Sequence, residues 1–196
     1  MAQDDKKIIH LYLLNKCTHN CKYCCNKQYN INEVPVVSKE ELSYADTLCL
    51  TGGEPFLLKD SVIELAIKTR MDFPNIKNIY VYTCGDSLYE YLSSENRLFK
   101  LMPLGGVNIA PKNKHDVECL EKLLENDEYW DEIDQLSSNR LYVFPNVQKE
   151  VCALLKKFTH KFKSFTIFDR EWQEEFVAQS GIFRRIPKLM DELAQN

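Results

Sequence analysis

The stretch Cys17-Thr18-His19-Asn20-Cys21-Lys22-Tyr23-Cys24 holds three cysteines at C-x3-C-x2-C spacing. Thiolates are the usual protein ligands of iron–sulfur clusters, and close spacing lets one loop supply several of them. A [4Fe-4S] cluster has four irons, so these cysteines would leave one iron open to another ligand. An open iron is a place for chemistry as well as for electron storage.

Zinc is the alternative metal for clustered cysteines. A structural zinc site needs four tetrahedral ligands, and Cys25 or Cys49 would supply the fourth. Zinc sites usually pair two short knuckles of ligands, and the sequence has no second knuckle. The spacing therefore favours an iron–sulfur cluster.

Each of two short motifs follows a predicted strand. The apolar run Ile8–Leu14 precedes the cysteines and is typical of a strand covered on both faces in a parallel sheet. A second strand, Thr47–Leu50, ends in Thr51-Gly52-Gly53-Glu54-Pro55. Glycines let the backbone adopt positive φ and come close to a ligand. Both motifs are therefore expected at the C-terminal edge of the sheet, where parallel α/β barrels hold their active sites.

Together the two motifs resemble those of the radical S-adenosylmethionine (radical SAM) superfamily. In that family an aromatic residue, here Tyr23, precedes the last cysteine, and a GGEP motif holds the amino group of SAM. The resemblance implies that Cys17, Cys21 and Cys24 each bind one iron and that SAM chelates the fourth. It also implies reductive cleavage of SAM to a 5′-deoxyadenosyl radical, which takes hydrogen from a substrate. The electron would come from an external donor such as flavodoxin or ferredoxin.

The candidate SAM contacts are Tyr23, Gly52, Gly53, Glu54, Asn108 and Lys112. Glu54 would accept a hydrogen bond from the SAM ammonium, directly or by placing the backbone. Asn108 and Lys112 would serve the ribose and the carboxylate, since a lysine pairs with a carboxylate as a point charge. The alternatives are a plain strand-to-helix turn for the glycines, core packing for Tyr23 and a solvated side chain for Lys112.

The remaining histidines and cysteines have plainer interpretations. His10 is expected to be a hydrogen-bonded core residue, and His19 an exposed one, with tuning of the cluster as its alternative. Cys84 stands where the family often has asparagine, and no role is predicted for it. The three cysteines on apolar faces are expected to act as small buried hydrophobes, namely Cys49, Cys119 and Cys152.

Strands and helices alternate along the chain. Further strands are predicted at 79–83, 104–109, 141–144 and 165–168. Capping boxes at Ser38 and Ser61 predict two helices, and helical spacing predicts others at 117–124, 147–158 and 186–193. The acidic stretch Asn126–Asn139 reads as a solvated connection, with an extra helix as the alternative. This alternation predicts an α/β fold with parallel strands: a partial (β/α)6 radical SAM barrel forming a single domain over residues 1–196.

The composition limits the partners and the cellular compartment that are expected for the protein. The chain has 196 residues, a net charge of −4 and no basic run, which argues against a nucleic-acid partner. Met1–Lys7 is polar and the apolar run after it is short, so neither a signal peptide nor a membrane span is predicted. Eight cysteines without a secretory signal indicate the reducing cytoplasm.

The substrate stays open between a small molecule and a peptide or protein. The chain is weakly similar to 7-carboxy-7-deazaguanine synthases, but it has Ala110-Pro111-Lys112 where they have Ser-Pro-Lys, and Cys25-Asn26 where they have Asp-Thr. Its compactness is also similar to that of glycyl-radical activating enzymes, whose substrate is a protein. A non-catalytic electron-transfer or iron-sensing protein is a further alternative, and the Gly52-Gly53-Glu54 motif argues against it.

Overall fold

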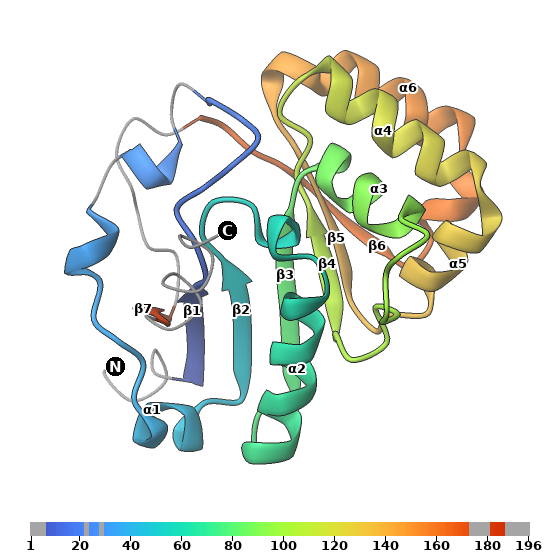
Figure 1. Ribbon diagram of the computed structural model, residues 1–196. Coiled ribbons are helices and arrows are strands. Elements are labelled where there is room, and N and C mark those ends of the chain that lie inside the picture. Colours follow the sequence, from blue (N-terminus) through green and yellow to red (C-terminus); the bar gives the residue numbers. More distant parts are fainter. Residues whose placement is uncertain (1–6, 22–23, 28–29, 173–180, 187–196) are drawn as a thin grey trace.

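The computed structural model describes residues 7–21, 24–27, 30–172 and 181–186 of the chain (Figure 1). Its strands form one parallel sheet in the order β6-β5-β4-β3-β2-β1-β7. The strands are β1 (Ile8–Tyr12), β2 (Thr47–Thr51), β3 (Asn78–Thr83), β4 (Gly106–Ile109), β5 (Asn139–Val143), β6 (Phe165–Asp169) and β7 (Ile182–Arg185). The α-helices are α1 (Lys39–Tyr44), α2 (Asp60–Asp72), α3 (Gly85–Ser93), α4 (Lys114–Glu125), α5 (Asp127–Asp134) and α6 (Gln148–Lys157).

The predicted fold class is confirmed, because neighbouring strands run parallel and are joined through helices. The sheet has one strand more than predicted: β7, with the sequence Ile-Phe-Arg-Arg, pairs with β1. The two arginines make this strand hard to predict from the sequence. Their partners lie far away in the chain: Arg184 pairs with Glu41, and Arg185 Nε donates to the carbonyl of Val34. The helix predicted from Ile186 onward lies mostly outside the described residues.

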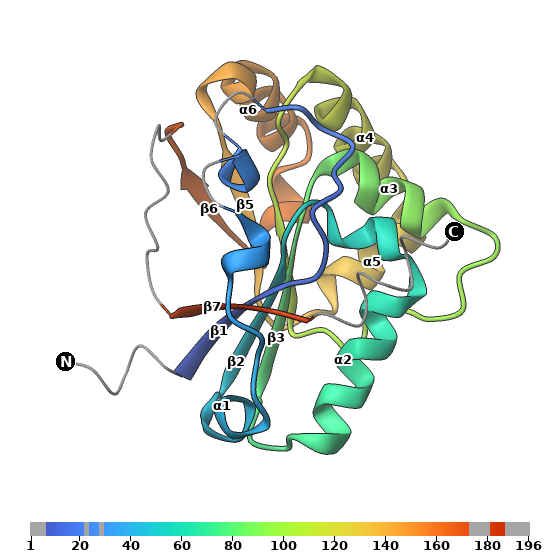
Figure 2. The same ribbon diagram turned by 60° about the vertical axis from the view of Figure 1, so that its left-hand side comes forward.

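Helices α2 to α6 cover one face of the sheet (Figures 1 and 2). Strand side chains alternate between the two faces, so every second residue points under these helices. On β3 these are Ile79 and Val81, and both belong to the buried apolar core. The other face carries Tyr80 and Tyr82 and has no such aliphatic lining. The core therefore sits between the sheet and one layer of helices.

Two capping boxes were predicted, and one is present. Ser38 accepts from the backbone N–H of Glu41, whose carboxylate accepts from the N–H of Ser38, at the start of α1. The box predicted at Ser61 and Glu64 is wrong, because α2 already begins at Asp60 and has no side-chain cap. Sequence spacing alone did not distinguish the two cases.

The acidic stretch 126–139 contains helix α5, so the solvated connection was the wrong alternative and the extra helix the right one. Trp130 is buried and packs against the rings of Phe162 and Phe165, with centroids 5.4 and 5.2 Å away. An apolar stripe with Ile133 holds the helix down while its acidic side stays in water. None of the helices in the described segments is long and apolar enough to cross a membrane.

Candidate functional site

The cysteine loop, described over residues 17–21 and 24–27, follows the carboxyl end of β1 (Figure 1). Cys17, Cys21 and Cys24 are half-buried, and none of the three forms a disulfide. Lys27, in the short 3-10 helix Cys25–Lys27, donates from Nζ to the carbonyl of Cys21 at 2.8 Å and so folds the loop back on itself. Three half-buried thiols on one loop are a donor set that fits a [4Fe-4S] cluster. Tyr23 lies outside the described residues.

The glycine turn, Thr51–Pro55, packs directly on the backbone that leads from β1 into the cysteine loop. The N–H of Gly53 donates to the carbonyl of Leu14 at 2.7 Å, and that of Glu54 donates to the carbonyl of Lys16 at 2.9 Å. A Cβ placed on Gly53 would lie 1.8 Å from the oxygen of Lys16, and Gly52 has a φ of +123°. Neither position tolerates a side chain. The two motifs are thus joined through their backbones, which the sequence did not predict.

Glu54 is buried and turned toward the end of β3. Its carboxylate accepts from the hydroxyl of Thr83 at 2.8 Å, from the N–H of Cys84 at 3.0 Å and from the N–H of Phe56 at 3.1 Å. Burial raises the pKa of Glu54, against the effect of these hydrogen bonds. The geometry gives Glu54 the task of tying the glycine turn to the next strand end, and its contact with SAM stays a prediction.

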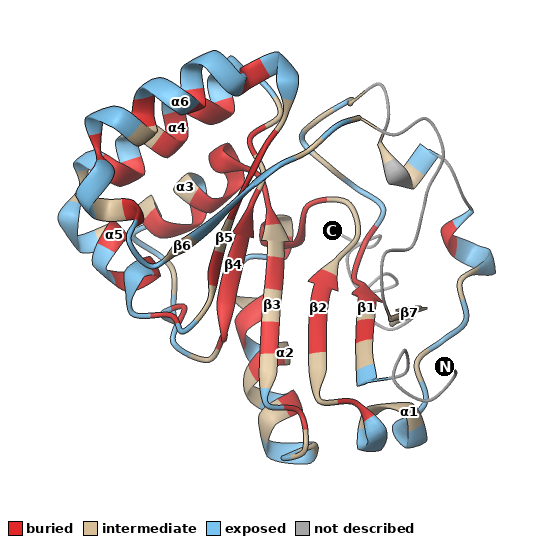
Figure 3. Ribbon diagram, turned by 180° about the vertical axis from the view of Figure 1, so that it is seen from behind, coloured by how far each residue is buried: buried red, intermediate tan, exposed pale blue. Residues whose placement is uncertain are grey.

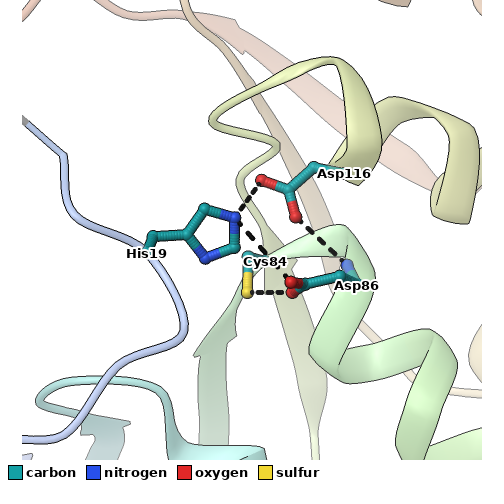
Figure 4. A group of neighbouring side chains, drawn as sticks. All are labelled: His19, Cys84, Asp86 and Asp116. Atoms are coloured by element: carbon teal, nitrogen blue, oxygen red, sulfur yellow. Dashed lines mark hydrogen bonds and ion pairs between the residues drawn. The ribbon is translucent and has the colours of Figure 1, made fainter.

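His19 is anchored and buried, so the expectation of an exposed ring was wrong. Its side chain is 7% exposed, and Nε2 lies 2.9 Å from Oδ2 of Asp116 and 3.9 Å from Oδ2 of Asp86 (Figure 4). Asp116 is fully buried and also accepts from the N–H groups of Lys112 and Asp86, at 2.7 and 3.2 Å. The ring therefore pins the cysteine loop to the starts of α3 and α4.

The charges of this pair support one another. The hydrogen bond to Asp116 raises the pKa of His19 to about 10, with burial acting in the opposite direction. Burial acts to raise the pKa of Asp116, but the hydrogen bonds from His19 and from the N–H of Lys112 hold it below its ordinary value. Both groups are therefore ionised at neutral pH.

Cys84 completes a compact group with His19, Asp86 and Asp116, whose donor atoms all lie within 4.8 Å of one another (Figure 4). The thiol of Cys84 lies 2.8 Å from Oδ1 of Asp86 and 2.9 Å from Oε2 of Glu54. Although such residue types can hold a metal, here they already satisfy one another as hydrogen bonds and an ion pair. Sequence reasoning missed this group because its members come from three separate loops. The one available signal was an aspartate in the first turn of each helix after β3 and β4.

Asn108 and Lys112, the candidates near β4, are both drawn into the protein. Asn108 is 0% exposed, and within the described part of the chain neither its Nδ2 nor its Oδ1 has a hydrogen-bond partner. A buried amide left unpaired costs about 1–3 kcal/mol, which points to a ligand at this position. The ammonium of Lys112 lies 3.5 Å from the ring centroid of Phe144 and 5.3 Å from that of Trp172. Lys112 is thus half-buried on aromatic rings and is not a solvated side chain.

The predictions for the other histidine and cysteines had different outcomes. His10 is partly buried and its ring stacks on Phe183, with centroids 4.7 Å apart. Cys49 and Cys119 are buried, as predicted. Cys152 is exposed, so its prediction was wrong, because it lies on the outer side of α6.

A parallel α/β sheet with a three-cysteine loop at its carboxyl edge defines a class of iron–sulfur protein. A family model described as "4Fe-4S single cluster domain" matches residues 8–105, which is half of the chain. The chain belongs to this family.

A relative extends the comparison toward the radical SAM proteins. Over 67 residues the chain is 34% identical to a protein of Methanocaldococcus jannaschii described as "Putative glycyl-radical enzyme activating enzyme". The match covers 31% of this chain and 28% of the relative, well under two thirds of its length. Together with the family match, this similarity supports an iron–sulfur protein of the radical SAM type.

Proposed function

We propose that the protein is a radical SAM enzyme. The observation that carries this proposal is the backbone junction between the two motifs, in which Gly53 donates to Leu14 and Glu54 to Lys16. A cluster held by the cysteine loop and a ligand held by the glycine turn would thereby lie side by side. The reaction that these two cofactors supply when bound is reductive cleavage of SAM, with a 5′-deoxyadenosyl radical as the agent of hydrogen abstraction.

The residues of the chain have separate tasks in this proposal. Cys17, Cys21 and Cys24 would hold three irons as thiolates. The backbone around Gly52 would meet the SAM amino group, in a conformation with positive φ that favours glycine. The unpaired amide of Asn108 would satisfy its donor and acceptor on the ribose or the carboxylate.

Lys112 would supply positive charge near the cluster. Its charge acts on Cys21, lowering the pKa of a thiol that burial raises. A cation beside the loop favours both thiolate ligands and the carboxylate of SAM.

The test is anaerobic reconstitution with iron and sulfide, followed by dithionite and SAM, with 5′-deoxyadenosine measured. We expect the wild-type protein to form 5′-deoxyadenosine and the Cys24→Ala variant to form none. A fully reconstituted wild-type protein that binds a cluster and leaves SAM intact would contradict the proposal. That outcome would favour the electron-transfer or iron-sensing alternative.

The similarity to the Methanocaldococcus jannaschii protein favours a second, narrower candidate: activation of a partner enzyme by hydrogen abstraction from a glycine. This candidate predicts a protein partner that co-purifies under anaerobic conditions. It also predicts a glycyl-radical signal in the electron paramagnetic resonance spectrum of that partner after reaction with SAM and dithionite. Cleavage of SAM without any such partner would leave the broader proposal standing alone.

A further inference from the structure

We infer that the face of the sheet opposite the helices binds the anionic group of a small planar substrate through Arg140 and Arg170. This inference rests on the proposed radical SAM function, because it assigns a substrate class to that same site. It favours a small organic anion over the glycine loop of a partner protein. The residues concerned are called the arginine–tyrosine face: Tyr80, Tyr82, Arg140, Tyr142, Phe168 and Arg170.

Strand register puts these side chains on one side. Tyr82 of β3 pairs with Asn108 of β4, which pairs with Arg140 of β5. Residues in register on neighbouring parallel strands point to the same side of a sheet. The residues that alternate with them, such as Val81 and Leu141, lie in the core under the helices. Figure 3 views the sheet from the opposite side, with strands β1 to β3 in front of α2.

Both arginines rest on aromatic rings. The guanidinium carbon of Arg140 lies 5.3 Å from the ring centroid of Tyr80. That of Arg170 lies 4.8 Å from the centroid of Tyr142 and 6.0 Å from that of Phe168. These contacts hold two positive charges in place, one on β5 and one directly after the end of β6, which preorganises them for a ligand.

Among the residues that the structure describes, neither guanidinium group has an acidic partner. Over the described ranges, no carboxylate forms an ion pair with Arg140 or Arg170, whereas Arg97 pairs with Glu132. Strand register places no Asp or Glu on this side of the described strands. Two half-buried cations with no acid beside them in the described segments are complementary to an anion, and arginine binds a carboxylate through two parallel hydrogen bonds.

The rings define the rest of the ligand. Tyr82 and Tyr142 stack with centroids 6.2 Å apart and an angle of 9° between their planes. Aligned rings of this kind offer a platform or a slot for another planar group. Arg140 lies in the row of Asn108, below the strand ends. A small molecule with an anionic group can reach Arg140 below the strand ends, whereas the surface of a folded protein partner cannot.

The same register links this face to the reaction. Asn108, proposed above as a SAM contact, is the direct neighbour of Arg140 across the strand pair. An anion held by Arg140 would therefore lie beside bound SAM. Hydrogen abstraction needs the reacting atoms to be adjacent and oriented, so this position suits a substrate.

The test uses benzoate as an anionic planar probe and benzamide as its uncharged counterpart, titrated into the reconstituted protein and followed by ligand-observed NMR. We expect saturable binding of benzoate and none of benzamide. Arg140→Gln and Arg170→Gln should each weaken benzoate binding about tenfold, the loss of one charged hydrogen-bonded contact. Arg140→Lys should fall between Arg140→Gln and the wild type, and the surface variant Lys157→Gln should bind like the wild type.

Three outcomes of the benzoate titration would overturn the inference. They are absence of saturable benzoate binding to the wild type, equal binding of benzamide, and unchanged benzoate binding in both glutamine variants. A fall in SAM affinity in Arg140→Gln that matches the fall for benzoate would also overturn it, because Arg140 would then hold the SAM carboxylate. Iron content and thermal unfolding of each variant guard against a folding defect. Since binding is measured without turnover, failure of SAM cleavage in the wild type is seen separately.

Discussion

The cysteine loop and the strand ends beside it are built in opposite ways. The loop has half-buried thiols and one short 3-10 helix. The strand-end network, made of Glu54, Cys84, Asp86 and Asp116, is buried, and its groups hydrogen-bond to one another and to neighbouring backbone. The conformation of the cysteine loop is therefore fixed mainly by contacts with other segments of the chain.

Two sets of contacts hold the loop in place. The glycine turn holds the chain just before Cys17 through the carbonyls of Leu14 and Lys16. The ion pair between His19 and Asp116 holds the loop between its first two cysteines. A change within the loop should therefore remove the cluster alone, and a change in its supports should disturb the loop and the fold together.

The largest effect is expected from Cys24→Ala. Loss of one of three thiolates should prevent stable assembly, so the absorbance at ~400 nm expected of a reconstituted [4Fe-4S] protein should disappear. Cys152→Ala, on the outer side of α6, is the matched control and should keep it. Full iron retention in the alanine variants of Cys17, Cys21 and Cys24, made singly, would refute the ligand assignment.

Gly53→Val should come next. A Cβ at this position would lie 1.8 Å from the backbone oxygen of Lys16, so the turn and the entry to the cysteine loop must move apart. We expect a loss of about 3 kcal/mol or more in the free energy of unfolding, together with poor iron incorporation. The measurements are urea unfolding of the apoprotein and iron content after reconstitution.

Gly105→Ala is the control for that change, because its added Cβ would have neighbours at 3.4 Å and beyond. It should fold and load iron normally. If Gly53→Val instead kept full iron and normal stability while losing only SAM binding, the glycine turn would act in SAM binding and not as a support of the cysteine loop. The support of the loop by the turn would then be disproved.

Asp116→Asn tests the second support. It removes the charge opposite His19 and keeps one oxygen, which can accept from only one of the two N–H groups that Asp116 binds, those of Lys112 and Asp86. Breaking a buried ion pair should lower the free energy of unfolding by about 3 kcal/mol. Hydrogen exchange at residues 18–21 of the apoprotein should also accelerate. Asp131→Asn, exposed on α5, should change neither quantity, and slow exchange in Asp116→Asn would show that the loop orders itself.

The ion pair between His19 and Asp116 also predicts that stability depends on pH. Because the folded state raises the pKa of His19 from 6.5 to about 10, the stability that its charge contributes is full below pH 6.5 and is lost as the pH rises toward 10. For Asp116, whose pKa is lowered, the contribution is lost as the pH falls below its ordinary value of 3.8. The measurement is unfolding of the wild-type apoprotein minus that of His19→Gln across this range. A difference that stays constant between pH 6.5 and 10 would rule out the charged pair.

Most of the fold follows from short stretches of sequence. Apolar runs such as Ile8–Leu14 predict strands, and the pair Ser38 and Glu41 predicts a cap, because strand burial and capping depend on residues a few positions apart. The predicted capping box at Ser61 failed because α2 begins one residue earlier. The solvated interpretation of 126–139 failed because packing on distant residues decided the outcome, as with Trp130 on Phe162. The strand β7 was missed for the same reason, since its arginines are satisfied by Glu41 and Val34.

The spacing of residues along the sequence was enough to predict an iron–sulfur site next to a glycine turn, because the three cysteines lie within eight residues and the glycine turn within five. Only the tertiary structure decided how those groups are held. His19 meets Asp116, and Glu54 meets Thr83, between segments far apart in the chain. The physical reason is that ligand spacing is local, whereas burial, ion pairing and register arise only when strands and helices from the whole chain come together.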